Sequence, residues 1–93
     1  MLRLVVAGEL DLTTADRLER AILEAERATP ARLTLDLAGV DFFDSTGLQI
    51  LLDADVRARA DGRELRVVTG TGEVARVLAL TEVDERLSVD RDG

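Results

Sequence analysis

The chain has 93 residues, of which 46% are hydrophobic and 33% charged, and its formal net charge is −7. This length suits one domain spanning residues 1–93, and the excess of acids disfavours nucleic acid or an anionic membrane surface as a partner, because both attract clustered cations. The absence of cysteine and histidine excludes disulfides, thiolate metal sites and any Ser–His or Cys–His nucleophile pair.

The first elements are predicted from short-range patterns. Residues 2–7 form an apolar, β-branched run, which predicts a strand that Gly8 ends. Apolar residues then recur at helical spacing over residues 15–28, with Thr13 and Thr14 available as caps for this helix. Residues 33–37 alternate between leucine and polar side chains, which predicts a second strand with one buried face.

The remaining elements follow the same alternation. Residues 38–43 lead from the second strand into a helix over residues 47–60, which Gly62 ends. Residues 65–68 predict a third strand, residues 74–78 a short helix, and residues 87–89 a last short strand. Residues 91–93 are expected to fray.

The order βαβαβαβ predicts a single small α/β domain with a mostly parallel, four-stranded sheet. The loops that follow parallel strands gather at one end of such a sheet, where open α/β folds place their sites. We therefore expect one acidic, hydroxyl-bearing surface there, made of Glu9, Asp11, Asp41, Asp44, Ser45 and residues 69–72.

Two catalytic interpretations of the loops are unconvincing. Residues 44–47 (Asp-Ser-Thr-Gly) differ from the Asp-Thr-Gly of aspartic proteases by one inserted residue, and no second copy supplies a partner carboxylate. Residues 70–75 fit the G-x-G-x-x-A dinucleotide pattern, but too little chain follows for the rest of a dinucleotide crevice. A tight turn between strand and helix explains these glycines better.

A metal site is not expected either. Asp36, Asp41 and Asp44 could hold a hard cation, but their spacing matches no known ligand set and solvated loop charges are the simpler explanation. We therefore expect no metal, no other cofactor and no enzymatic activity. The apolar runs are too short to cross a bilayer and no leader precedes the first strand, so the expected location is cytoplasmic.

Ser45 has two interpretations. Asp44, Ser45 and Thr46 are all residue types that cap a helix, so Ser45 can be an ordinary cap. Alternatively its hydroxyl is held in the open as a phosphorylation site, with Thr46 a less favoured acceptor. A kinase substrate needs only to be accessible, because another enzyme supplies the chemistry.

Three segments resemble the STAS domain of bacterial anti-sigma factor antagonists: residues 8–18 (with Gly-Glu-Leu-Asp at 8–11), residues 33–48 (with Val-Asp-Phe-Phe-Asp-Ser-Thr-Gly-Leu at 40–48) and residues 77–84. The similarity covers nearly the whole chain in the family's order. Family members usually have an additional strand before the one predicted at residues 2–7 and often a further C-terminal helix. We therefore expect the sheet edge beside residues 2–7 to be uncovered, which invites pairing or partial instability. The expected oligomeric state is a monomer or a weak dimer.

The resemblance implies a switch. It implies that an anti-sigma factor, which is an ATP-dependent serine kinase, phosphorylates Ser45. It also implies that only the unphosphorylated form binds this kinase and so frees the sigma factor. A serine phosphatase would then reset the cycle by removing the phosphate. The implied partner-binding residues are Asp11, Asp41, Asp44, Ser45, Thr46 and Gly47. Two alternatives remain: a non-phosphorylated STAS adapter, in a lipid-transport ATPase or a stress-sensing scaffold, and a small nucleotide-binding protein that uses residues 70–72.

Overall fold

The computed structural model describes residues 1–83 and 86–91. Residues 92 and 93, which were predicted to fray, lie outside the described residues. The elements are β1 (Leu2–Leu10), α1 (Ala15–Arg27), β2 (Arg32–Phe43), α2 (Ser45–Ala60), β3 (Glu64–Val68), α3 (Glu73–Leu80) and β4 (Ser88–Asp90). The strands form one sheet in the order β1-β2-β3-β4, and each neighbouring pair is parallel. The predicted βαβαβαβ order and the parallel four-stranded sheet are confirmed.

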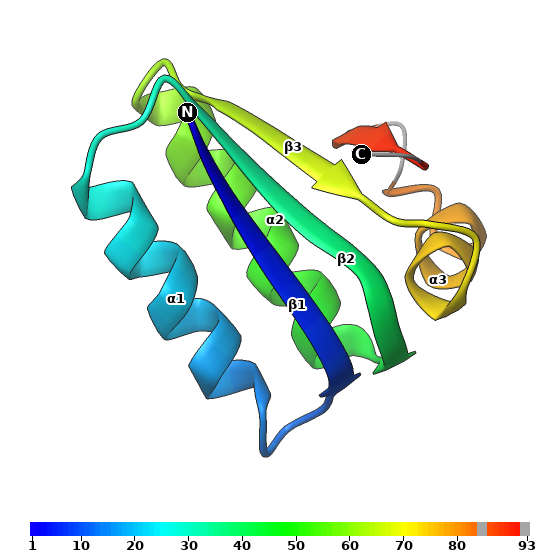
Figure 1. The fold of residues 1–93 in the computed structure, drawn as a ribbon. Helices are drawn as coiled ribbons and strands as arrows, with labels where there is room; N and C mark the ends of the chain where they lie inside the picture. Colours follow the sequence, from blue (N-terminus) through cyan, green and yellow to red (C-terminus); the bar gives the residue numbers. More distant parts are fainter. Residues whose placement is uncertain (84–85, 92–93) are drawn as a thin grey trace.

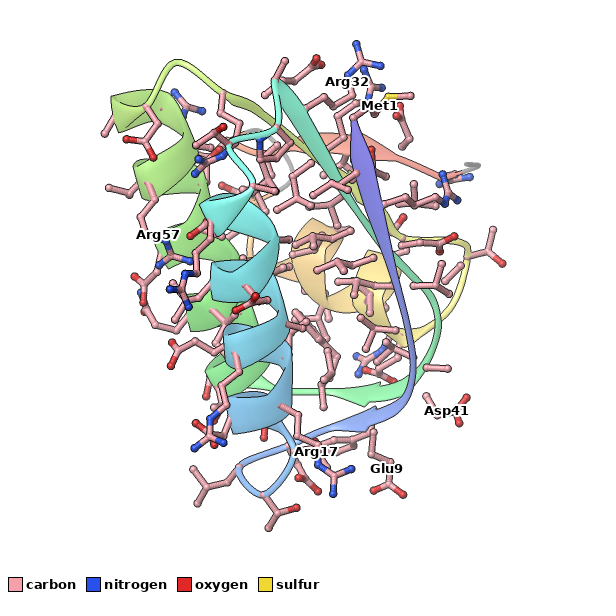
Figure 2. All side chains as sticks on the ribbon, turned by 60° about the vertical axis from the view of Figure 1, so that its left-hand side comes forward. Met1, Glu9, Arg17, Arg32, Asp41 and Arg57 are labelled. Carbon is pink, nitrogen blue, oxygen red and sulfur yellow. The ribbon has the colours of Figure 1, made fainter. Side chains whose placement is uncertain are left out.

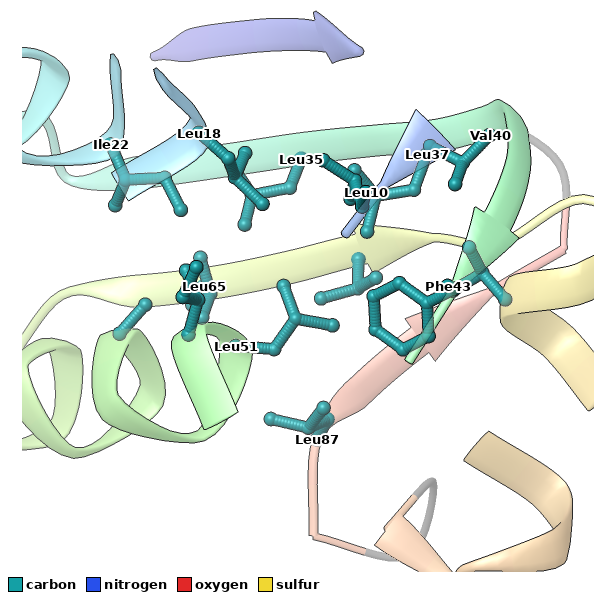
Figure 3. Packing of buried hydrophobic residues seen from close by; sticks show 14 of the residues in the cluster. Leu10, Leu18, Ile22, Leu35, Leu37, Val40, Phe43, Leu51, Leu65 and Leu87 are labelled. Atoms are coloured by element: carbon teal, nitrogen blue, oxygen red, sulfur yellow. The ribbon is translucent and has the colours of Figure 1, made fainter. Parts of the chain in front are cut away.

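The core lies between the sheet and the helices. Helices α1 and α2 cover one face of the sheet, and α3 packs against β2 (Figure 1). Leucine, isoleucine and valine side chains from both layers fill this space, and Phe43 is the aromatic ring among them (Figure 3). The largest fully buried apolar side chains are those of Ile22, Leu33, Leu35, Leu37, Leu51, Val67, Val74 and Leu78.

The two strands that lead to the predicted site are longer than their sequence pattern indicated. β1 continues through Gly8 to Leu10, so the expectation that Gly8 ends the strand is wrong. Gly8 has φ +91°, a left-handed conformation that only glycine adopts without strain, and it still pairs with Val40 of β2. β2 likewise continues to Phe43, with irregularities in its register against β1.

β1 is an edge strand of this sheet. Among the strands that the structure describes, it pairs only with β2. Its side chains alternate between the helix-covered face and solvent, and Val5 on the solvent side is 72% exposed. The expectation of an uncovered edge beside residues 2–7 is confirmed.

Candidate functional site

The candidate site lies where β1 and β2 end. The last paired residues of the two strands are Leu10 and Phe43. Asp11 and Asp44 follow them directly, so both residues leave the sheet at the same end, where Figure 1 shows both arrowheads. The predicted gathering of these two loops is confirmed.

Two further carboxylates belong to this end of the sheet. Glu9 lies near the end of β1 and Asp41 near the end of β2, and both are exposed. Figure 2 shows both at the same end of the molecule, with Arg17 of α1 beside Glu9. This end of the sheet is therefore acidic, as the sequence predicted.

Residues 69–72 do not join this surface, contrary to expectation. β3 pairs with β2 only as far as Val68, opposite Asp36, while β2 continues well beyond that point. Gly70 instead packs on the middle of β2, where a Cβ would lie 3.0 Å from the Cβ of Ala38. This close approach and a φ of +64° explain the glycine without a nucleotide.

Asp44 caps α2, which leaves Ser45 exposed. The Oδ1 atom of Asp44 accepts hydrogen bonds from the backbone N–H groups of Thr46 at 3.0 Å and Gly47 at 3.4 Å. Its extended backbone is typical of a capping residue. Ser45 is the first residue of the helix and its side chain is exposed. Of the three candidate residues, Asp44 is the one that caps α2. The prediction that the Ser45 side chain is accessible is confirmed.

Gly47 lets the first turn of α2 rest on the ring of Phe43. A Cβ at Gly47 would lie 2.7 Å from Cε1 and 3.0 Å from Cδ1 of this ring. The ring is only 3% exposed, so it cannot move aside without disturbing the core. Gly47 is itself buried, and it positions its neighbours rather than presenting a surface of its own.

Asp11 organises the loop before α1. Its Oδ1 atom accepts hydrogen bonds from the Thr13 hydroxyl at 2.7 Å and from the backbone N–H groups of Thr13 at 2.9 Å and Thr14 at 3.2 Å. The Thr14 hydroxyl donates to the carbonyl of Glu9 and caps nothing, so the expected capping of α1 by threonine side chains is wrong. The hydrogen bonds from Thr13, and then those from Thr14, lower the pKa of Asp11.

This loop gives a pH-dependent prediction. In a Thr13→Val variant, which keeps the side-chain shape but loses the hydroxyl donor, the pKa of Asp11 should rise towards its ordinary value. A carboxyl whose pKa is lowered on folding stabilises the fold above its unfolded pKa, and this stabilisation is lost as the pH falls through the folded pKa. The variant should therefore lose less stability than wild type during acidification.

Carbon-13 NMR titration of the Asp11 carboxyl measures its pKa directly in wild type and in the variant. Thr71→Val, in an exposed loop away from Asp11, is the matched control and should leave the titration midpoint where it is in wild type. An unchanged midpoint in Thr13→Val would show that the hydroxyl contact does not shape the titration of Asp11.

Two exposed apolar side chains beside the site were missed by the sequence interpretation. Leu12 is 80% exposed in the loop after Asp11, and Phe42 is 46% exposed next to the buried Phe43. The sequence could have indicated an exposed phenylalanine, because consecutive strand residues point to opposite faces. Only one of two adjacent phenylalanines can therefore enter the core. Exposed apolar groups next to a polar site are typical of protein interfaces.

The acids are not arranged as a metal site. Asp36 accepts a hydrogen bond from the N–H of Ala38 at 3.1 Å and pairs with Arg3 at 2.6 Å, and these two contacts lower its pKa. Within residues 1–83 and 86–91, no group of three or more acidic side chains is placed to hold a metal ion. In the same part of the chain, no helix is both long enough and apolar enough to cross a membrane.

The fold and site define a small parallel α/β domain that presents an exposed serine hydroxyl among carboxylates at one end of its sheet. Residues 1–92 match the STAS domain, and the chain belongs to this family. The resemblance seen in the sequence is confirmed.

The proteins that this chain is similar to include anti-sigma factor antagonists. The chain is 48% identical over 48 residues to the anti-sigma-F factor antagonist RsfB of two Mycobacterium tuberculosis strains. This alignment covers 52% of the chain but only 39% of these relatives. The solved structure of an anti-sigma factor antagonist from Mycobacterium paratuberculosis superposes with a TM-score of 0.88 at 30% identity, covering 97% of this chain and 77% of that one.

Proposed function

We propose that this protein is an anti-sigma factor antagonist controlled by phosphorylation of Ser45. The unphosphorylated form binds an anti-sigma factor with serine kinase activity and so frees the sigma factor, and a serine phosphatase reverses the modification. The observation that carries the proposal is the exposed hydroxyl at the first position of α2, next to a capping residue that leaves it unused. The named function of the relatives supports the class of partner.

The electrostatics of the helix start suit a reversible phosphate. A phosphoserine adds about −1.5 to −2 charges, and a helix N-terminus favours an anion by roughly 0.3–1 kcal/mol. The carboxylates of Asp44 and Asp41 oppose it by a similar order, because they are at least partly exposed. The domain should therefore stay folded when phosphorylated, and the new charge should act on the face that the partner meets.

The surroundings of Ser45 supply the parts of a binding surface. Leu12 and Phe42 provide apolar area that a partner can bury, and the carboxylates provide a polar rim. The proposed partner-binding residues are Asp11, Leu12, Asp41, Phe42, Asp44, Ser45 and Thr46, with Gly47 supporting them from below. Such a protein acts by binding, needs no cofactor, and works in the cytoplasm, where transcription takes place.

The test is to measure the affinity for the anti-sigma factor with a charge placed on Ser45. Ser45→Asp should weaken binding by roughly tenfold or more, because a like or unmatched charge is then buried in the interface. Ser45→Ala and Ser45→Asn should bind as wild type does, since neither adds a charge and Asp44 still caps the helix. Isothermal titration calorimetry measures all of these affinities.

Ser88 provides a matched control. It is the only other serine in the chain, it is exposed, and it begins β4 rather than α2. Ser88→Asp adds the same charge away from the site and should leave the affinity unchanged. Equal loss of affinity in Ser45→Asp and Ser88→Asp would mean that net charge, and not the site, controls binding.

Phosphorylation itself needs a separate experiment. Incubating the protein with candidate anti-sigma kinases and ATP, followed by mass spectrometry, should place the phosphate on Ser45 and not on Ser88. If no candidate kinase places a phosphate on Ser45, the non-phosphorylated adapter is favoured instead.

A further inference from the structure

An exposed leucine lies in the loop that joins β1 to α1. Leu12 is 80% exposed, and Figure 1 shows this loop projecting beyond the ends of β1 and β2. The loop follows Leu10, which pairs with Phe43, so it lies at the same end of the sheet as Ser45. A leucine left in water forgoes the free energy of apolar burial, which a partner that covers it recovers.

Asp11 holds this loop in one conformation. Its Oδ1 atom accepts hydrogen bonds from the N–H groups of Thr13 and Thr14, and its backbone carbonyl accepts from those of Thr14 at 3.2 Å and Ala15 at 2.8 Å. Its own backbone N–H donates to the Thr14 hydroxyl at 3.0 Å. These bonds join Asp11 to the residues beyond Leu12, so the backbone is fixed on both sides of the leucine. A side chain on a fixed loop loses less conformational freedom on binding.

The carboxylate of Asp11 is already used within the loop. Besides the two N–H groups, its Oδ1 atom accepts a hydrogen bond from the Thr13 hydroxyl at 2.7 Å, and the residue is half-buried. Glu9 and Asp41, at the same end of the sheet, are exposed and remain available to cations of a partner. The conformation of the loop therefore accounts for Asp11 without any contact between its charge and a partner.

We propose that Leu12 is the apolar anchor of the partner-binding surface and inserts into an apolar pocket of the anti-sigma factor. Asp11 is then a positioning residue, which holds Leu12 in the conformation that binds. This inference rests on the proposed function, because it concerns the same partner and the same end of the sheet. It requires the partner to hold an apolar pocket opposite the loop between β1 and α1, and not a cation opposite Asp11.

Other exposed apolar side chains suit this role less well. More than half of the surface of Phe42 is covered by the domain itself. Val56 and Leu80 are exposed, but they lie in α2 and α3, outside the proposed partner-binding residues. Among these four side chains, Leu12 has the largest exposed fraction and the only position on a loop beside the site.

Two replacements of Asp11 separate its hydrogen bonding from its charge. Asparagine keeps the Oδ1 acceptor and loses the charge, whereas alanine loses both. The probe is the anti-sigma factor that wild type binds in the Ser45 experiment, and calorimetry measures its affinity. Asp11→Asn should bind within about threefold of wild type. Asp11→Ala should bind roughly tenfold more weakly, because the loop must then be ordered on binding.

Truncation of Leu12 tests the anchor. Leu12→Ala should weaken binding by about tenfold or more, since most of the apolar side chain is lost. Leu80→Ala truncates another exposed leucine at the end of α3 and is the control, which should bind as wild type does. The double variant Asp11→Ala with Leu12→Ala should match Leu12→Ala alone, because a positioning residue has no effect once the residue that it positions is removed.

NMR relaxation of the free protein gives a readout that needs no partner. The order parameter of the Leu12 backbone N–H should have the value of rigid backbone in wild type and in Asp11→Asn, and it should fall in Asp11→Ala. An unchanged order parameter in Asp11→Ala would show that Asp11 does not hold the loop. The same spectra show that the variants are folded.

Two binding results would overturn the inference and leave the proposed function intact. The first is that Leu12→Ala binds the anti-sigma factor as wild type does. The second is that Asp11→Asn loses as much affinity as Asp11→Ala, because the charge of Asp11 is then what the partner contacts. If no candidate anti-sigma factor binds wild type, the proposed function itself fails, and this inference fails with it.

Discussion

Replacing Phe43 with alanine should lower the free energy of unfolding by about 3–5 kcal/mol. The ring is 3% exposed in the core and supports the first turn of α2 at Gly47, so its loss leaves a cavity directly beneath the site. A cost of this size is a large part of the total stability of a small domain. Urea denaturation followed by circular dichroism measures the change.

The neighbouring Phe42 is the matched control for this prediction. It has the same side chain one position earlier in β2, but it is 46% exposed. Phe42→Ala should cost less than about 1 kcal/mol, since little apolar area leaves the core. It should instead weaken binding to the anti-sigma factor. Equal loss of stability in the two variants would contradict the assignment of Phe43 to the core and Phe42 to the surface.

Glu26→Gln should also destabilise the fold, by about 2 kcal/mol. The Glu26 carboxylate lies between α1 and α2 and accepts hydrogen bonds from Nε of Arg57 at 2.9 Å and from Nη2 of Arg63 at 3.4 Å. The side chain of Arg63 is only 7% exposed, and glutamine would leave the mostly exposed carboxylate of Asp61, at 3.1 Å, as its remaining anionic partner. We expect a smaller loss of stability than for a fully buried ion pair, because the side chain of Arg57 is one-third exposed.

A second glutamate on the same helix separates this effect from a general loss of charge. Glu24 pairs with Arg27 at 3.5 Å, and both side chains are mostly exposed. Glu24→Gln should change the stability by less than about 0.5 kcal/mol, because solvent screens such surface pairs. Thermal unfolding at low and high salt compares the two variants. If Glu24→Gln cost as much as Glu26→Gln, burial would not explain the effect.

The element order could be predicted because side-chain periodicity is a local property. Residues 33–37 alternate and residues 15–28 repeat at helical spacing, and the structure has a strand and a helix over these segments. Strand ends were less predictable. Gly8 is a strong local stop signal, but its pairing with β2 keeps it inside β1, and that pairing is a tertiary property.

The composition of the site was only partly predictable. Three adjacent residues could each cap α2, and only the backbone conformation decides that Asp44 does so and leaves Ser45 free of that role. Residues 69–72 were placed wrongly because the sequence does not show that β2 extends far beyond β3. The loop at Asp11 was also misinterpreted, because Thr13 and Thr14 were expected to cap α1 but donate to Asp11 instead. The signal was present in the sequence, since an aspartate followed two residues later by such donors is a common hydrogen-bonded turn.

The separation of roles between Asp44 and Ser45 has a kinetic consequence. Under the proposed function, the phosphate is carried by a side chain that does not cap the helix, so adding or removing it should require no rearrangement of the backbone. We therefore expect the lifetimes of the two proposed states to be set by the turnover of the kinase and phosphatase and not by a slow relaxation of the domain. A binding signal that lags behind dephosphorylation in a stopped-flow experiment would argue against this.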